Sequence, residues 1–162
     1  MAALMRTTSA ASRLLTSRMS SVLASRGYAD EMDFTFAAAN QVFYANANVK
    51  QVDVPSFSGA FGILPKHVPT LAVLKPGVVT VFEKEGSSKK VFVSSGTITI
   101  NEDSSVQVLA EEAHPLESLD GSAAKEALRQ AQSNLSSASS DYDKAVAAIE
   151  VEVAEALVQA TN

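Results

Sequence analysis

The sequence predicts an α+β protein whose two kinds of secondary structure lie in separate segments. An N-terminal antiparallel β-sandwich, or flattened barrel, is followed by a C-terminal antiparallel two-helix hairpin. From about residue 33 to residue 119, short apolar runs follow the period of two that is typical of strands. After Asp120-Gly121, the apolar residues are spaced by alternating steps of four and three, which is typical of helices that pack in pairs.

The first 28 residues contain four arginines, no acidic residue and many Ser and Thr. This composition is typical of a mitochondrial transit peptide. Arg26-Gly27-Tyr28-Ala29 resembles a matrix-processing site, so we expect cleavage after Tyr28; a disordered basic tail is the alternative. Removal of residues 1–28 leaves nine basic residues against 18 acidic ones, a net charge of −9. Such an acidic product is a poor candidate for binding nucleic acid or anionic lipid.

We place the β-sandwich at residues 29–120. Seven short runs rich in β-branched and aromatic residues predict its strands, at 34–36, 42–44, 49–54, 78–82, 90–93, 97–100 and 106–109. Residues that favour turns separate the runs, as at Glu85–Ser88 and Asn101–Ser105. Many short strands with close turns and no helix between them indicate a sandwich or a barrel.

The stretch Phe57–Gly77 is apolar but interrupted by glycine and proline. Gly59 and Gly62 can adopt backbone angles that are closed to other residues. Three prolines fix φ and remove backbone donors, at Pro65, Pro69 and Pro76. We expect a stiff connection that presents a surface or leads the chain from one sheet to the next.

Residues 121–162 predict the helical hairpin. The first seam consists of Ala124, Leu128, Ala131, Leu135 and Ala138, and the second of Tyr142, Val146, Ile149, Val153, Ala156 and Ala160. Ser140 and Asp143 fit a capping box at the start of the second helix. Alanine side chains bury little area, so we expect the hairpin to lean on the sandwich or on another protein.

The sequence contains no motif for catalysis, metal binding or cofactor binding. It lacks the Gly-x-Ser-x-Gly elbow, the phosphate loop and the His-Glu-x-x-His helix, and it has no cysteine. We interpret Gly86–Lys90 as a hairpin turn, Glu111-Glu112 as solvated charges, His67 as a packed or interface residue and His114 as a domain-boundary residue. No apolar run approaches the roughly 18 residues needed to span a bilayer. We therefore predict no catalytic residues, no metal and no cofactor.

One motif carries a resemblance to a known family. Within Phe57–Gly77, the pattern Gly-x-Phe-Gly-Ile-Leu-Pro-x-His-x-Pro-Thr-Leu, followed by Leu-x-Pro-Gly, resembles the signature loop of one subunit of the F-type ATP synthase. That subunit is called delta in mitochondria and epsilon in bacteria and chloroplasts, and the resemblance here is to the mitochondrial form. It extends from about Asp33 to the C-terminus through Gln41–Phe43, Val49–Pro55, Val93–Gly96 and Leu109–Ala113.

The resemblance implies a ten-stranded β-sandwich with a two-helix hairpin. It also implies a non-catalytic subunit of the central rotor stalk of the proton-translocating ATP synthase, on the matrix side of the mitochondrial inner membrane. The implied partners are the gamma subunit, the ring of c subunits and the small mitochondrial epsilon subunit. By position-to-position match, the tip of the signature loop would face the ring and His67 would lie near gamma; the tip comprises Ser58, Gly59, Ala60 and Phe61.

Two other functions remain as alternatives. Some bacterial relatives bind ATP in the hairpin, and some extend it so that basic helix residues meet acidic loops of the catalytic subunits. Here the second helix carries five acidic residues against Lys144 alone, and Arg129 is the only arginine of the hairpin. Both features disfavour a nucleotide-sensing or inhibitory arm. A small matrix hydrolase is disfavoured by the missing catalytic motifs.

Overall fold

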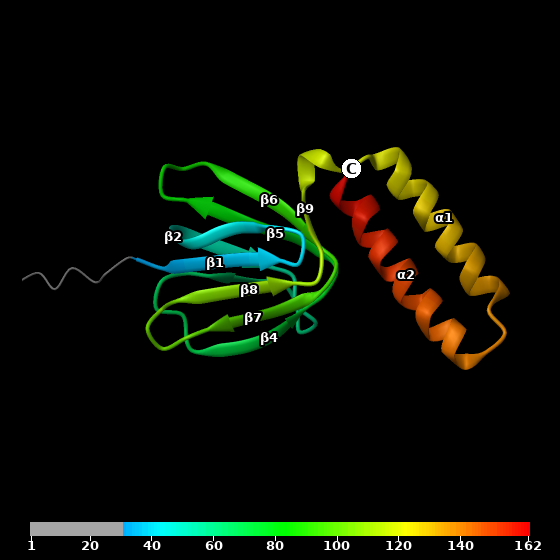
Figure 1. Cartoon of the computed structure of the whole chain (residues 1–162), viewed down its shortest axis with the longest axis horizontal. Coiled ribbons are helices and arrows are strands. Elements are labelled where there is room, and N and C mark those ends of the chain that lie inside the picture. The colour runs from blue at the N-terminus through cyan, green and yellow to red at the C-terminus, as the bar shows by residue number, and fades with distance from the viewer. Residues whose placement is uncertain (1–30) are drawn as a thin grey trace, which may run out of the picture.

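A computed structural model describes residues 31–162, so the transit peptide expected at residues 1–28 lies outside the described part. Strands come first in the chain and helices last (Figure 1). The strands are β1 (Asp33–Ala38), β2 (Val42–Val54), β3 (Phe61–Ile63), β4 (Thr70–Leu74), β5 (Gly77–Glu83), β6 (Ser88–Val93), β7 (Gly96–Ile100), β8 (Val106–Ala110) and β9 (Ala113–Pro115). A short 3₁₀ turn, η1 (Leu116–Ser118), leads to the helices α1 (Gly121–Ser137) and α2 (Asp141–Ala160). The predicted fold class is confirmed.

Strand β2 links the two layers of the sandwich. Its first half pairs with β1, and its second half pairs with β3 and β5. The strand order is β4-β7-β8-β1-β2-β5-β6-β9, with β3 beside β2. The described residues therefore form nine strands, not the ten that the resemblance implied, because one long strand serves both layers. The same strand joins two runs, 42–44 and 49–54, that the sequence predicts as separate.

Two further expectations about the sheet need correction. The sandwich is not wholly antiparallel, because β1 pairs with β8 in parallel. The stretch Phe57–Gly77 is also more than a connection, since it contains β3 and β4. Pro69 and Pro76 flank β4 closely, and β4 lies at an end of the strand order, where a sheet tolerates nearby proline best.

The core lies between the layers and consists of alternate residues of the strands. Thr97–Ile100 shows the pattern: Ile98 and Ile100 are buried, whereas Thr97 is exposed. The largest fully buried side chains are those of Phe34 and Phe36, whose ring centroids lie 6.1 Å apart. This packing gives the sandwich a compact core of its own.

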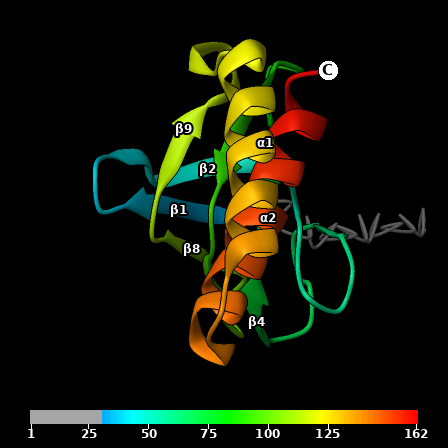
Figure 2. The ribbon, with the colours of Figure 1, turned by 90° about the vertical axis from the view of Figure 1, so that its right-hand side faces the viewer.

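The two helices form the predicted antiparallel hairpin, and each begins with a side-chain cap. At α1, the Asp120 carboxylate accepts a hydrogen bond from the Ser122 amide at 2.7 Å, and this bond lowers the pKa of Asp120. At α2, the Asp143 amide donates to Ser140 Oγ at 3.0 Å, while Ser140 Oγ donates to Asp143 Oδ2 at 2.6 Å. The predicted capping box is confirmed. Figure 2 shows the hairpin lying across one end of the sandwich.

The seam predicted for the second helix is wrong. In α2 the buried residues are Ala147 and Ala154, whereas Tyr142 is 77% exposed and Ile149 is 62% exposed. Two sets of residues in α2 follow the same helical spacing, and the alanine set lets the helices approach more closely. In α1 the predicted seam holds better, because Ala124 and Ala131 are buried there.

Candidate functional site

The tip of the signature loop is a tight turn. Ser56 is buried, and its Oγ donates to the Gly59 carbonyl at 2.7 Å while the Gly59 amide donates to the Ser56 carbonyl at 3.0 Å. Gly59 has a φ of +119°, a conformation that L side chains rarely adopt. Phe57, Ser58, Gly59 and Ala60 are all exposed. The fold therefore presents Ser58, Gly59 and Ala60 of the predicted tip to solvent, whereas the fourth predicted tip residue, Phe61, is half-buried at the start of β3.

The tip is attached to the free edge of β4. Ser56 forms an isolated bridge with Leu74, and the Phe57 amide donates to the Val73 carbonyl at 3.3 Å. The Lys75 amide donates to the Pro55 carbonyl at 3.2 Å. These bonds occupy part of an edge that would otherwise be open, and they place the aromatic ring of Phe57, which is exposed, beside β4.

His67 lies in the turn after β3, where its amide donates to the Leu64 carbonyl at 3.1 Å. Its Nδ1 lies 2.9 Å from the Val68 carbonyl oxygen, so this nitrogen carries the proton. The His67 and Phe61 ring centroids are 6.0 Å apart. The structure thus brings His67, in the turn after β3, close to Phe61, which follows the tip residues Ser58, Gly59 and Ala60 at the start of β3. The His67 ring contacts the Val68 carbonyl and lies near the Phe61 ring, and neither of these groups could take part in acid–base catalysis with it.

An exposed apolar row crosses the outer face of one layer. Strand pairing sets Val73 opposite Thr97, Thr97 opposite Leu109, Leu109 opposite Ala37 and Ala37 opposite Val42. Residues paired in this way point to the same face of a sheet. Val73, Leu109 and Val42 are 54%, 56% and 63% exposed. We call these five residues the outer apolar row; Leu71 and Phe57 extend its apolar surface at the β4 edge.

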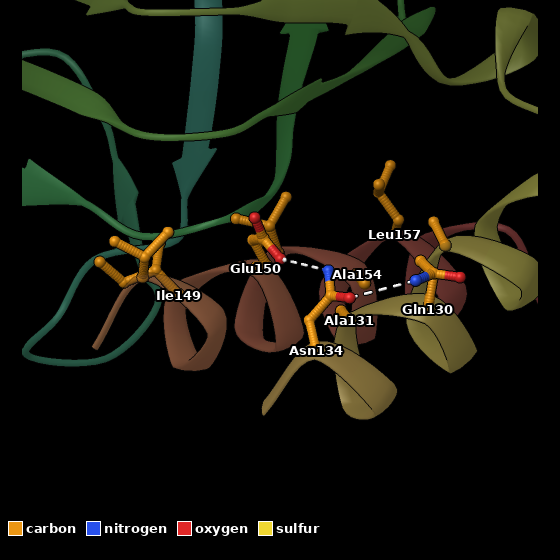
Figure 3. Close-up of a pocket in the computed structure, with 10 residues that line it drawn as sticks. Gln130, Ala131, Asn134, Ile149, Glu150, Ala154 and Leu157 are labelled. Atoms are coloured by element: carbon orange, nitrogen blue, oxygen red, sulfur yellow. Dashed lines mark hydrogen bonds between the residues drawn. The ribbon is translucent and has the colours of Figure 1, made fainter. Parts of the chain in front are cut away.

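A second apolar surface is a groove of about 500 Å³ between the helices. Its walls include Ala131 of α1 and four large side chains of α2: Val146, Ile149, Val153 and Leu157. Figure 3 shows Gln130, Asn134 and Glu150 linked by hydrogen bonds in the groove, with Asn134 Nδ2 donating to Glu150 Oε2 at 3.3 Å. The wall residues from α2 are mostly those that the sequence assigned to the helix seam.

A cluster of polar side chains around Glu83 has a structural role. Glu83 accepts hydrogen bonds from Tyr44 Oη at 3.0 Å and Ser87 Oγ at 2.8 Å, and forms a salt bridge with Lys89 at 3.0 Å. The bond from Lys89 is the largest cause of the lowered pKa of Glu83, whereas burial is the largest cause of the raised pKa of Tyr44. These contacts fasten the β5–β6 hairpin to β2. Of the predicted hairpin turn Gly86–Lys90, only Gly86 and Ser87 lie in the turn between β5 and β6, because β6 begins at Ser88; Glu111 and Glu112 are exposed as expected.

Within residues 31–162, no group of three or more His, Asp or Glu side chains is arranged to hold a metal ion. None of the helices described is long and apolar enough to cross a membrane. The outer apolar row and the groove between the helices are exposed apolar surfaces, a feature that is typical of sites of contact with other macromolecules.

Residues 31–116 match the family model described as "ATP synthase, Delta/Epsilon chain, beta-sandwich domain". The chain is 47% identical over 152 residues to "ATP synthase subunit delta, mitochondrial" of Caenorhabditis elegans, a match that covers 88% of this chain and 93% of the relative. The chain belongs to the ATP synthase delta/epsilon family.

Other mitochondrial members of the delta/epsilon family support the same assignment. The delta subunit of Saccharomyces cerevisiae is 42% identical, over 87% of this chain and 91% of its own length. That of Kluyveromyces lactis is 43% identical, over 91% of this chain and 94% of its own length. The predicted family, including its mitochondrial form, is confirmed.

Two solved structures share the fold of this delta/epsilon family chain. A chain of the Euglena gracilis mitochondrial ATP synthase OSCP/F1/c-ring structure matches with a TM-score of 0.75 and 23% identity, over 82% of each chain. A chain of the Tetrahymena thermophila central stalk/c-ring structure matches with a TM-score of 0.63 and 16% identity, over 81% of this chain and 96% of its own. At these identities the matches support the fold.

Sequence reasoning on this delta/epsilon chain missed Phe57, the outer apolar row and the helix groove as candidate interaction surfaces. The signal for the row was present in β4, whose outward residues Leu71 and Val73 are both apolar, as in strands that are covered on both sides. The signal for the groove was that α2 carries two apolar stripes. One contains Ala147 and Ala154, which are buried, and the other contains Val146, Ile149 and Val153, which line the groove.

Proposed function

We propose that the chain is a non-catalytic subunit of the central rotor stalk of the mitochondrial proton-translocating ATP synthase. In this role it passes rotation of the c-subunit ring through gamma to the catalytic head. The observation that carries the proposal is the near full-length similarity to mitochondrial ATP synthase delta subunits. The assemblies that contain the structural matches, an OSCP/F1/c-ring complex and a central stalk/c-ring complex, agree with it.

The physical character of the sandwich suits a part that transmits torque. A compliant body would deform under load and blur each rotational step. Here β2 joins both layers as one strand, and the core between them is fully buried. The tip is fixed to β4, and proline reduces the freedom of the signature loop. Close packing makes such a body stiff.

The surface for gamma is the outer apolar row together with the His67 turn. By resemblance His67 lies near gamma, and β4, which contributes Val73 to the row, begins three residues later at Thr70. The two surfaces are therefore continuous along the chain. An apolar centre is what a permanent subunit interface requires.

The surface for the c-subunit ring is the tip of the signature loop. Ser58, Gly59 and Ala60 are exposed and small, and Phe57 beside them offers an exposed aromatic side chain. Phe61 begins β3 and is half-buried, so it supports the tip rather than standing at its end. The rigid turn lets a short loop hold a defined position against the ring.

The surface for the small mitochondrial epsilon subunit is the groove between the helices. Its α2 side chains Val146 and Ile149 are exposed and Val153 is half-buried, whereas the buried residues of α2 are Ala147 and Ala154. Covering them would stabilise a hairpin whose seam consists of alanines and buries little area.

We place the protein on the matrix side of the mitochondrial inner membrane, where it is held by the ring and does not enter the bilayer. The basic first 28 residues would direct import. We divide the mature chain into a sandwich domain at residues 29–120 and a hairpin domain at residues 121–162.

Co-purification in mild detergent tests the proposal. The mature chain, residues 29–162, should co-purify with gamma and the c ring in one complex. Calorimetric titration of the same chain with ATP should give no binding heat, because neither a phosphate loop nor an arginine cluster is available. Absence of the chain from the complex, or saturable ATP binding, would favour the nucleotide-sensing alternative instead.

The hairpin is not an inhibitory arm. All five acidic residues of α2 are exposed, and an acidic helix is repelled by acidic loops of catalytic subunits. A chain that ends at Gly121 should therefore leave the rate of ATP hydrolysis by the reconstituted assembly unchanged. Retention of the truncated chain in the assembly is the control, and a clear rise in the rate would contradict the prediction.

A further inference from the structure

Two strained residues of the described chain contact each other. Among residues 31–162, Asn46, Lys66 and Ser104 are the non-glycine residues with positive φ, at 50°, 66° and 69°. Side chains disfavour this left-handed conformation, and it persists only where the surroundings enforce it. The Lys66 amide donates a hydrogen bond to Ser104 Oγ at 3.2 Å. One hydrogen bond thus links Lys66 and Ser104, which are 38 positions apart in sequence.

The fold places the two residues in neighbouring turns. Thr70 at the start of β4 pairs with Ile100 at the end of β7, so the turn before β4 and the turn after β7 lie at the same end of the layer. In Figure 1 this is the end of the sandwich away from the helices. One turn contains Lys66 and His67, and the other is Asn101–Ser105.

The Asn101–Ser105 turn is fixed by its own hydrogen bonds. The Asn101 amide donates to the Ser105 carbonyl at 2.9 Å, and Asn101 Nδ2 donates to Ser105 Oγ at 2.8 Å. Asp103 Oδ1 accepts from the Ser105 amide at 2.9 Å and from Ser105 Oγ at 2.7 Å, and these bonds lower the pKa of Asp103. Such a turn can act as a rigid support.

The turn that it supports presents apolar side chains to solvent. In the segment 64–69, Leu64 and Val68 are exposed; Pro65 and Pro69 fix their own φ but have no amide hydrogen to donate to a neighbouring turn or strand. A bond from outside the segment is therefore of particular value in choosing its conformation.

We propose that the Asn101–Ser105 turn is a brace for the His67 turn, with Ser104 as its positioning residue. The Ser104 hydroxyl holds the Lys66 amide, and with it the backbone that presents Leu64 and Val68 to the gamma subunit. The identity of this partner rests on the proposed function; the brace itself rests on the hydrogen bond and on the two left-handed residues.

The test compares Ser104→Ala with a matched control, Thr35→Val, in the mature chain. Thr35 Oγ1 accepts a bond from the amide of Asn46, the third left-handed residue, also at 3.2 Å. The control therefore removes an equivalent bond between β1 and β2. The measurements are hydrogen exchange of the Lys66 and His67 amides in the free chain, and the Kd for gamma.

Ser104→Ala should accelerate exchange at Lys66 and His67 and weaken gamma binding about threefold to tenfold, the usual consequence of losing one hydrogen bond. Ser104→Gly should do the same although glycine relieves the strained φ, because the lost hydroxyl is the cause. Thr35→Val should leave both measurements at wild-type values. Unchanged exchange at Lys66 in the alanine and glycine variants would overturn the brace, whether or not gamma binds. Failure of the wild-type chain to bind gamma would instead refute the proposed partner.

Discussion

Replacing Val73 and Leu109 by aspartate together should abolish binding of the chain to gamma while leaving the chain folded. Both side chains are more than half exposed in the free protein, so the charges remain hydrated there. In the complex they would be buried at the centre of an apolar interface. An unpaired buried charge costs several kcal/mol, and each 1.4 kcal/mol changes Kd tenfold, so a loss of about a thousandfold is expected.

Adding two charges elsewhere provides the matched control. Ser88→Asp with Gln132→Asp changes the net charge equally at exposed positions of β6 and α1. This variant should bind gamma like the wild type. Circular dichroism of both variants should show the wild-type melting curve. Wild-type affinity in the Val73/Leu109 variant would mean that gamma does not contact the outer apolar row.

Replacing Gly96 by alanine should destabilise the sandwich strongly. A Cβ at this position would clash with the Leu109 carbonyl oxygen and would lie 2.9 Å from the Ala110 Cα. Both are backbone atoms of the neighbouring strand β8, which pairs with β7 on one side and β1 on the other and cannot move without breaking those pairs. Overpacking of this kind costs about 3 kcal/mol in the free energy of unfolding, which urea denaturation measures.

Gly86→Ala separates crowding from conformational strain. No atom lies within 4 Å of a Cβ at Gly86, but its φ is +90°. The expected loss is about 1 kcal/mol, from the left-handed backbone alone. If Gly96→Ala were no more destabilising than Gly86→Ala, the tight approach of β7 and β8 would not limit stability.

The regular parts of the fold were predictable because local pattern decides them. The strict alternation at Thr97–Ile100 predicts a strand, and the Ser140–Asp143 pair predicts a helix start. The folded chain has both. The strands that escaped prediction depend on distant partners. Strands β3 and β9 have only three residues each, and β4 lies between prolines, so pairing with β2, β6 and β7 respectively makes them strands.

The candidate surfaces were less predictable because they depend on what remains uncovered after folding. His67 and the loop tip could be named from the motif, but the row that joins Val73 to Val42 exists only once four strand pairings are known. In α2 two apolar stripes compete for the same neighbour. The choice of Ala147 and Ala154 for the seam follows from how closely the helices can approach, which spacing alone does not reveal.

The central claim is that this chain couples rotation of the ring to synthesis in the catalytic head. Its most direct test is the rate of proton-driven ATP synthesis in inner-membrane vesicles from cells that lack the chain, with and without the mature chain restored. Synthesis should be near background without the chain and should return with it, while ATP hydrolysis by the detached catalytic head continues throughout. Synthesis at the normal rate in vesicles without the chain would contradict the account.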